Sequence, residues 1–304
     1  MRSASCIPIF AVFALQLTSA ASAASAASAT APAPTPRSAT QPTKVWRTLP
    51  EPPGIPAPTH SGEIEVSPSV NIHYARFGHG RPVVLLHGGL GALEDWSWQI
   101  AALAPHYEVI AIDSRAQGRS SHTIESLSYA QMADDTAAVL QALQLPSAAV
   151  VGWSDGGIIA LELALRHPAV VRALFVIGTN FDTSGMRGGK TAPTVAAYFA
   201  RAKRLQRQRG TTPKQLAALL VALRQMWRNE PHITVAALAK ITVPVAVVLG
   251  EYDELIEQKH AALLARSVGN GAFTALSNAS HFAMWQTPDA VNALLLRWLR
   301  GVLR

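Results

Sequence analysis

The chain has 304 residues, 49% of them hydrophobic and 15% charged, a composition that fits a globular protein with a large core and excludes a disordered chain. Its formal net charge is +7, but the basic residues are not gathered in one long run, so the charge does not indicate nucleic-acid binding.

The first residues have the pattern of an export signal. After Met-Arg, residues 6–17 are apolar, and residues 18–27 are small, with several A-x-A-like cleavage sites. The apolar stretch is too short for a stable span of the bilayer. We predict a signal peptide over residues 1–23, no stable membrane insertion after its cleavage, and a periplasmic or secreted protein. An uncleaved anchor is the alternative. The only cysteine, Cys6, would leave with the signal.

Residues 24–61 are rich in Ala, Ser, Thr and Pro, with eight prolines between Pro32 and Pro56. Prolines block both helix and sheet hydrogen bonding. This segment therefore predicts a flexible or polyproline-like linker, and the folded domain is expected over residues 62–304.

Strands and helices alternate through most of this domain. Segments 63–66 and 70–77 predict an antiparallel strand pair. Apolar runs predict further strands at 82–86, 107–112, 148–151, 173–177, 243–249 and 272–276. Helical spacing appears at 129–143, 156–167, 255–268 and 288–303. The alternation predicts an α/β fold with a doubly wound, mostly parallel sheet covered on both faces.

The alternation breaks over residues 180–240, which contain no convincing strand and two or three helices. Thr191 and Thr212 stand where N-caps belong, each with a proline close behind. We interpret this segment as a helical lid inserted at the carboxyl edge of the sheet, where ligands bind in such folds.

The lid is basic, with ten Lys or Arg residues from Arg187 to Arg228. These charges form either a solvated face or a surface that attracts acidic substrates or an anionic envelope surface. An apolar inner face is available from Tyr198, Phe199, Met226 and Trp227.

The sequence Gly152-Trp153-Ser154-Asp155-Gly156 follows the strand at 148–151 and opens a helix. This G-x-S-x-G arrangement places a serine on a sharp strand-to-helix turn, where flanking bulky residues do not fit. Ser154 is therefore the predicted nucleophile.

A serine hydroxyl needs a base, and the base needs an orienting acid. His281 follows the last strand and Asp253 follows the strand at 243–249, giving the chain order Ser, Asp, His of a hydrolase sheet. We predict His281 as the base and Asp253 as the acid. Asp182, Glu251 and Glu254 are the alternatives to Asp253.

Other residues have structural interpretations. His87 is expected to belong to a His-Gly turn, His167 to lie on the surface, and His260 to lie within a helix. Asp113 is expected to organise its own loop with Arg115.

The oxyanion hole needs two backbone donors. One is predicted to be the amide of Asp155. The other is predicted to come from the loop after the strand at 82–86, from Gly89 or else Leu90. Since the histidines and acids show no metal-ligand spacing, no metal or cofactor is expected.

These motifs together resemble the α/β-hydrolase superfamily. The resemblance is carried by His87-Gly88-Gly89, the D-x-R-x-x-G-x-S run at 113–120, the serine turn, Gly250-Glu251-Tyr252-Asp253, and Ser280-His281-Phe282. It implies an α/β-hydrolase fold and a Ser-Asp-His hydrolase. Ala116 departs from the glycine common in relatives.

The form G-W-S-D-G-G is similar to that of the valacyclovir hydrolase branch, which cleaves amino-acid esters. That resemblance implies a substrate-binding role for Asp155 toward a cation, and the alternative is that Asp155 complements the helix dipole. Trp153 is a further candidate for the substrate pocket, as are Trp96, Trp98 and Trp285.

We therefore expect a serine hydrolase that cleaves a small ester or related acyl compound, with a small molecule as its partner. Three activities remain open with the same residues: carbon–carbon bond hydrolysis, enol-lactone hydrolysis and a cofactor-free peroxidase side activity. A non-catalytic ligand-binding module of the same fold also remains open.

Overall fold

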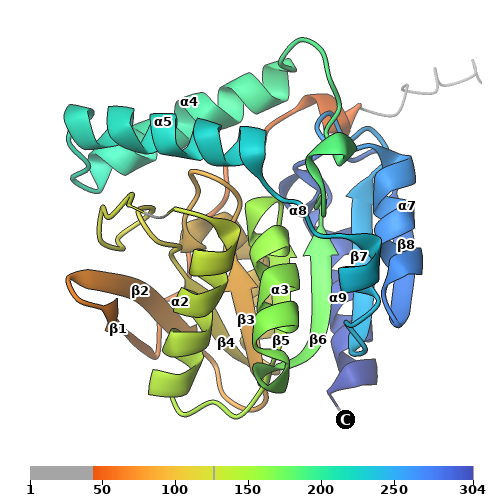
Figure 1. Ribbon diagram of the computed structural model, residues 1–304, viewed down its shortest axis with the longest axis horizontal. Coiled ribbons are helices and arrows are strands. Elements are labelled where there is room, and N and C mark those ends of the chain that lie inside the picture. The colour runs from red at the N-terminus through yellow and green to blue at the C-terminus, as the bar shows by residue number, and fades with distance from the viewer. Residues whose placement is uncertain (1–43, 126, 304) are drawn as a thin grey trace, which may run out of the picture. The chain divides into compact units, whose positions relative to one another are not determined.

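The computed structural model describes residues 44–125 and 127–303. The predicted signal peptide and the beginning of the predicted linker lie outside the described residues. In the described part, helices cover both sides of one central sheet (Figure 1). None of these helices combines the length and apolar character needed to cross a bilayer.

The described residues form one eight-stranded sheet, in the order β1-β2-β4-β3-β5-β6-β7-β8. The strands are β1 (His60–Ser67), β2 (Val70–Phe77), β3 (Pro82–Leu86), β4 (Glu108–Ile112), β5 (Ala148–Trp153), β6 (Val171–Ile177), β7 (Pro244–Gly250) and β8 (Asn270–Leu276). β2 pairs antiparallel with β1 and β4, and the other neighbouring strands are parallel. The predicted mostly parallel, doubly wound sheet is confirmed.

The chain leaves β3 for β4 on one side and later places β5 on the other side of β3. At such a switch point the loops that follow the two central strands diverge and leave a crevice between them. The loops after β3 and β5 are the two that carry Gly89 and Ser154. The topology therefore brings the predicted oxyanion loop beside the predicted nucleophile.

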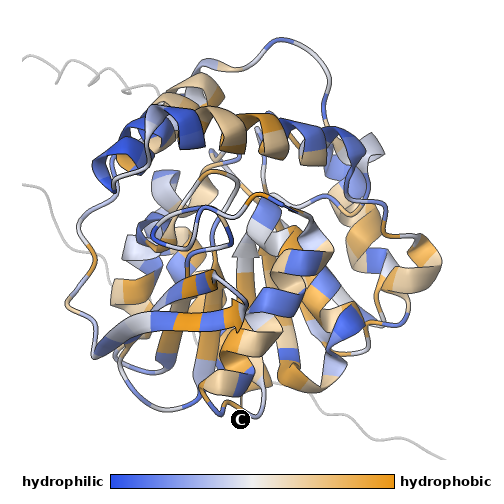
Figure 2. Cartoon of the chain, turned by 60° about the vertical axis from the view of Figure 1, so that its left-hand side comes forward, coloured by the Kyte–Doolittle hydropathy of each residue, from blue (hydrophilic) through white to orange (hydrophobic). Residues whose placement is uncertain are grey.

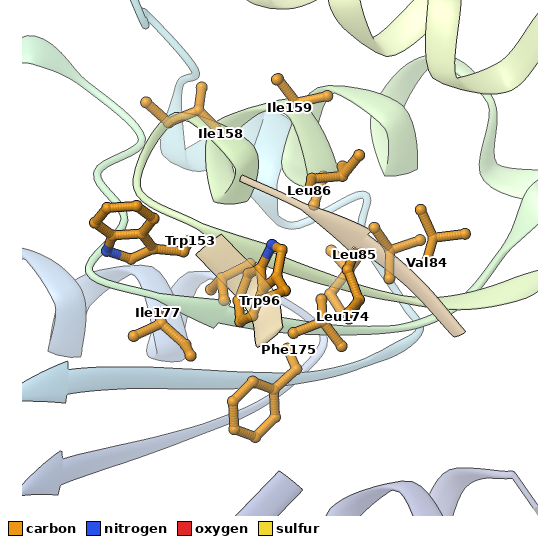
Figure 3. Packing of buried hydrophobic residues seen from close by; sticks show 14 of the residues in the cluster. Val84, Leu85, Leu86, Trp96, Trp153, Ile158, Ile159, Leu174, Phe175 and Ile177 are labelled. Atoms are coloured by element: carbon orange, nitrogen blue, oxygen red, sulfur yellow. The ribbon is translucent and has the colours of Figure 1, made fainter. Parts of the chain in front are cut away.

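The central strands are apolar on both faces because helices cover both faces. Every residue of β5 is buried, whereas β1 at the sheet edge alternates between exposed and partly buried positions. Trp96 and Trp153 belong to the same buried cluster as Leu85 and Phe175 (Figure 3). In Figure 2 the strands are predominantly hydrophobic, while the lid helices mix hydrophilic and hydrophobic residues. This core fixes the strand ends from which the site loops emerge.

The helices lie in layers on the two faces of the sheet. They are α1 (Ser97–Leu103), α2 (Tyr129–Ala142), α3 (Asp155–Arg166), α4 (Pro193–Gln208), α5 (Pro213–Asn229), α6 (Val235–Leu238), α7 (Gln258–Ser267), α8 (Ala283–Gln286) and α9 (Pro288–Val302), with short 3-10 turns η1 (Val45–Arg47), η2 (Leu93–Trp96), η3 (Pro168–Val170) and η4 (Thr183–Gly185). α2 and α3 pack together on one face, and α9 lies on the other in contact with α1 and α8 (Figure 1).

The predicted lid segment, 180–240, contains α4, α5 and α6 and no strand of the sheet. α4 and α5 form a hairpin above the carboxyl ends of the strands (Figure 1). Thr212 caps α5 as predicted. The prediction of Thr191 as a cap is wrong: Ala192 is the N-cap of α4, because Pro193 occupies the first helical position.

The linker prediction is wrong for the first described residues. Nε2 of Gln286 donates hydrogen bonds to the carbonyl oxygens of Trp46 (3.2 Å) and Thr48 (2.7 Å). The ring of Trp46 stacks on Tyr252, with centroids 4.4 Å apart. Apart from η1, the described residues before β1 form no helix or strand, yet their backbone carbonyls and an aromatic ring find partners on the domain; β1 begins at His60.

Candidate active site

Ser154 lies on the sharp turn between β5 and α3. Its backbone has φ 54° and ψ −119°, a strained conformation for a residue with a side chain. A Cβ at Gly156 would overlap the carbonyl of Leu86, and a Cβ at Gly152 would overlap the carbonyl of Gly156. Because only glycine fits these close approaches, the sequence G-x-S-x-G folds into this turn at the carboxyl edge of the sheet.

The three residues predicted as a triad lie in one hydrogen-bonded row. Oγ of Ser154 is 3.0 Å from Nε2 of His281, and Nδ1 of His281 is 3.0 Å from Oδ2 of Asp253. The amides of Leu255 and Ile256 both donate to Oδ1 of Asp253 at 2.9 Å. The side chains of His281 and Asp253 are 2% and 1% exposed. The row therefore has the order nucleophile, base, acid that activates a serine.

The alternative acids are used elsewhere. Oδ2 of Asp182 lies 3.1 Å from Nδ1 of His232, and its Oδ1 accepts the amide of Ser184. Oε2 of Glu251 accepts the amide of Asn278. Both oxygens of Glu254 also have partners, which are the hydroxyl of Thr194 and the amide of His281. Glu254 therefore binds the backbone amide of His281, whereas Asp253 contacts the imidazole ring of His281.

His87 and His260 have structural partners, as predicted. The amide of Ser114 donates to Nε2 of His87, whose Nδ1 lies 2.7 Å from the carbonyl oxygen of Gly88. This arrangement places the proton on Nδ1 and ties the β3 loop to the β4 loop. Burial lowers the pKa of His87. His260 lies in α7, stacks on Phe181 and accepts its amide hydrogen bond.

Asp113 organises its loop, but not with Arg115. Its carboxylate accepts the amides of Leu93 (2.7 Å) and Arg119 (2.9 Å), while Arg115 forms a buried ion pair with Asp135 in α2. Arg115 is close to Asp113 in the sequence, but in the folded chain α2 places Asp135 beside Arg115, and the ion pair forms there instead.

The backbone amides of Gly89 and Asp155, the two predicted oxyanion donors, have no hydrogen-bond acceptor among the described residues. The amide of Leu90, predicted as the alternative donor, is instead occupied by Oε1 of Gln117. Leu90 adopts φ 64°, which turns this amide toward the Gln117 side of the loop. Gly89 thus remains the available donor of the β3 loop, and its carbonyl accepts the hydroxyl of Tyr198 at 3.0 Å.

The carboxylate of Asp155 is held by two neutral donors. The hydroxyl of Tyr129 donates to Oδ1 at 2.9 Å, and Nε1 of Trp227 donates to Oδ2 at 2.8 Å. Asp155 is 7% exposed, and burial raises its pKa to about 6 against the opposing effect of the two hydrogen bonds. It stands at the start of α3, as expected for a residue that complements the dipole, but it also ties α3 to α2 and α5.

Trp153 is 1% exposed, and its Nε1 donates to the carbonyl oxygen of His281 at 2.8 Å. Its ring packs against Tyr198 and Phe282. A small edge of Trp153 reaches the cavity, but its contacts make it chiefly a support for the His281 loop. Trp96 and Trp285 are buried in the core and do not line the cavity, nor does Trp98.

A cavity of about 460 Å³ opens above Ser154 and His281. The predicted apolar inner face of the lid contributes Tyr198, Phe199 and Trp227, whereas Met226 is buried away from it. The remaining lining residues come from the loops at the carboxyl edge of the sheet and from the helices next to them: Gly89, Tyr129, Trp153, Asp155, Asn180, Met186, Arg187, Gly188, Gly189, Lys190, Thr191, Ala192, Val195, Arg224, Glu230, Glu254, Leu255, Ile256 and Phe282. The lid therefore forms much of the wall.

The charge around His281 favours its protonated form. Burial acts to lower the pKa of His281, but the charge and hydrogen bond of Asp253, with smaller contributions from Glu254 and Asp155, raise it above its ordinary value overall. This environment suits the role predicted for His281, which requires a group that accepts a proton and is stabilised as an imidazolium.

Several residues of the site carry no sequence signal. Tyr129 and Gln286 lie outside the recognised motifs, and Gln117 is a variable position within the run at 113–120; only the packing of the chain brings them to the site loops. Among the described residues, no group of three or more His, Cys, Asp or Glu side chains is arranged to hold a metal ion.

Comparison with known proteins places this geometry among relatives. A family model described as alpha/beta hydrolase fold matches residues 81–232, half of the chain. RutD of Azorhizobium caulinodans, named provisionally as a carbamate hydrolase, is 28% identical over 248 residues, covering 74% of this chain and 94% of that protein. BpoC of Mycobacterium tuberculosis, named provisionally as a non-heme bromoperoxidase, is 28% identical over 264 residues, covering 77% and 99%.

A solved structure described as Est816, an N-acyl homoserine lactone degrading enzyme, is also similar. It shares 28% sequence identity with a TM-score of 0.61, covering 77% of this chain and 98% of that chain. These proteins share the fold and most of their length with the described domain.

Proposed function

The chain belongs to the alpha/beta hydrolase family, and from this membership we propose that it is a serine hydrolase that cleaves a small carboxylic ester or related acyl compound through an acyl-enzyme. The observation that carries the proposal is the row of Ser154, His281 and Asp253, with two 3.0 Å contacts, at the floor of a cavity. A hydroxyl in this position has its base within proton-transfer distance.

The proposed reaction has two steps. Oγ of Ser154 attacks the substrate carbonyl carbon while its proton passes to Nε2 of His281. The oxyanion that forms accepts hydrogen bonds from the backbone amides of Gly89 and Asp155. His281 returns the proton to the leaving oxygen as the carbon–oxygen bond breaks. Water then loses a proton to His281 and attacks the acyl carbon, and Ser154 regains its proton as the acid leaves.

The cavity wall supports an apolar acyl or leaving group. Its volume of about 460 Å³ lies within the range of sites that hold small organic ligands. Val195, Phe199 and Trp227 give the lid side of the wall an aliphatic and aromatic surface. A small to medium ester fits this chemistry.

We further propose that the cavity rim attracts acidic substrates. The three acids that line the cavity already accept hydrogen bonds from the protein: Asp155, Glu230 and Glu254. The cations Lys190 and Arg224 also line the cavity and have no hydrogen bond or ion pair among the described residues. Lys190 and Arg224 can therefore each pair with a carboxylate of the substrate.

A lactone is the second candidate substrate. The lactone-degrading enzyme Est816, at 28% identity and near-complete coverage of its chain, supports this candidate. The row of Ser154, His281 and Asp253 would open a cyclic ester by the same steps. Carbon–carbon hydrolysis, the peroxidase side activity and a non-catalytic binding role remain open with the same residues.

Export is proposed from the sequence of residues 1–23. Fractionation of cells that produce the full chain, with mass spectrometry of the mature N-terminus, tests it: cleavage near Ala20 or Ala23 and release from membranes are expected. Recovery of the uncleaved chain in the membrane fraction would support the anchor alternative.

A fluorophosphonate probe tests the proposed function. Purified protein should be labelled at Ser154 and should turn over p-nitrophenyl esters. The Ser154→Ala variant should lose both, whereas the control Ser184→Ala, at an exposed serine, should keep both. Absence of labelling and turnover in a folded wild-type protein would leave the binding-module alternative.

A further inference from the structure

The first described residues, 44–51, contact three separate parts of the site, and we name them the N-terminal strap. The base side is reached through Gln286, a buried residue at the end of α8. Its Nε2 donates to the carbonyl oxygens of Trp46 and Thr48, and its Oε1 accepts the amide of Ser280 at 2.7 Å. Ser280 directly precedes His281, so one amide side chain joins the strap to the backbone of the base.

The lid side is reached through Arg201 in α4. Nη1 of Arg201 donates to the carbonyl oxygen of Pro50 at 2.9 Å and pairs with Glu51 at 3.3 Å. The guanidinium lies over the ring of Trp285, 4.2 Å from its centroid, and its side chain is only 5% exposed. Arg204, one turn away, also pairs with Glu51. The strap is therefore fixed to a buried group of the lid.

The same helix holds the oxyanion loop. The hydroxyl of Tyr198, three residues before Arg201, donates to the carbonyl oxygen of Gly89. Nε2 of Gln206 lies 3.4 Å from the carbonyl oxygens of Leu90 and Gly91. Because α4 is bound both to the strap and to the oxyanion loop, it links the position of the strap to the position of the donor loop.

The acid side is reached through an aromatic contact. Trp46 stacks on Tyr252 with an interplanar angle of 13°, and Tyr252 directly precedes Asp253. The strap thus contacts the acid loop and the helix that holds the oxyanion loop directly, and it is joined to the base loop through Gln286.

We propose that the N-terminal strap is a positioning element of the active site, acting through Gln286 on His281 and through Arg201 and Tyr198 on Gly89. Its catalytic meaning rests on the proposed serine hydrolase function. Displacements of about 1 Å in positioned groups cost up to about a hundredfold in rate. Loss of the strap contacts should therefore lower kcat more than it raises KM.

Two variants of the full chain test this role from its two sides. Trp46→Ala/Glu51→Ala removes the side-chain anchors of the strap, which are at least partly exposed, so the fold should be kept. Gln286→Ala removes the link to Ser280. The matched control Pro53→Ala/Pro58→Ala changes two exposed residues just after the strap, whose rings offer no hydrogen-bonding group to the site.

On a p-nitrophenyl ester, both test variants should lose about tenfold in kcat with KM within about twofold of the wild type, and the control should lose nothing. The melting temperature is measured beside them. An unchanged kcat, or a loss that appears only near the melting temperature, would show a merely structural strap.

The titration of His281, followed by NMR, gives a readout that needs no turnover. Loosening the base loop should weaken the contact of His281 with Asp253 and move the pKa of His281 down in both variants but not in the control. An unchanged pKa overturns the strap role even if the wild type proves inactive. Wild-type inactivity with shifted titration would instead count against the hydrolase proposal alone.

Discussion

Oδ2 of Asp155 accepts a hydrogen bond from Nε1 of Trp227, with the two atoms 2.8 Å apart, so the residue after the nucleophile is tied directly to the lid. The other oxygen is taken by Tyr129. With a donor on each oxygen, the carboxylate has a structural use that needs no substrate cation. Kinetic measurements can distinguish whether Asp155 binds a cation of the substrate or only anchors the lid.

Asp155→Asn should reduce kcat/KM by about five- to thirtyfold for plain acyl esters and aminoacyl esters alike, since an amide can accept from only one of the two donors. Trp227→Phe should show the same lack of discrimination, because it removes one of those donors. Kinetics on matched ester pairs checks this. A much larger loss for aminoacyl esters in Asp155→Asn, with Trp227→Phe unaffected, would make Asp155 the receptor of a substrate cation.

The strands of the central sheet are predictable from the sequence because a buried parallel strand consists of a short run of consecutive apolar residues. The runs at 82–86 and 148–151 fall on β3 and β5, and both are followed by glycine-rich turns. Ser154, Asp253 and His281 each come shortly after such a run, so the parallel sheet alone sends them to one edge. By contrast α1 and α8 give no such signal, because seven and four residues are too few for a helical period.

The contacts between the lid and the domain are not predictable from local patterns. The pairing of Asp155 with Trp227 joins residues 72 positions apart, and that of Tyr198 with Gly89 joins residues 109 apart. Both depend on the height and rotation of α4 and α5 above the sheet. The sequence alone does not decide between Gly89 and Leu90 for the same reason, since only the folded loop shows Gln117 occupying the amide of Leu90.

The acidic limb of the pH profile of kcat/KM should report the pKa of His281. Its pKa lies above the ordinary value, and only the neutral imidazole accepts a proton, so activity should fall as the pH drops through that raised pKa. Asp253→Asn removes the charge that raises the pKa. The limb should then move to lower pH, while kcat falls by about 10³–10⁴-fold through loss of the oriented tautomer.

Asp182→Asn is the matched control, because Asp182 is the alternative acid and pairs with His232 instead. Its pH profile should superimpose on that of the wild type. A limb that shifts in Asp182→Asn and stays in place in Asp253→Asn would reverse the assignment of the acid.

Glycine at position 156 should be required for folding and not only for activity. The added Cβ of Gly156→Ala would overlap the backbone carbonyl of Leu86, which belongs to the central strand β3 and cannot move aside cheaply. A loss of at least about 2 kcal/mol in the free energy of unfolding is expected, comparable to the cost of overpacking a core.

Gly301→Ala is the opposite case, because its Cβ would enter open space in α9 and should stabilise by up to about 1 kcal/mol. Urea unfolding of both variants measures the contrast, and equal effects would show that the turn relaxes.

The charge of the cavity rim should select among substrates. Lys190 and Arg224 line the cavity without hydrogen-bond or ion-pair partners among the described residues, so a carboxylate on the substrate would find an uncompensated cation there. Lys190→Gln/Arg224→Gln should lower kcat/KM for a monoester of a dicarboxylic acid by about three- to tenfold, the effect of one or two solvent-screened charge pairs, and leave the neutral ester of equal length unchanged. Raising the salt concentration should lower the wild-type rate on the acidic ester toward that of the variant.

Arg228→Gln, at a residue of α5 that does not line the cavity, is the control for net charge alone. If it matched the double variant, the basic lid would be acting as a diffuse field, and the rim would have no specific part in recognition.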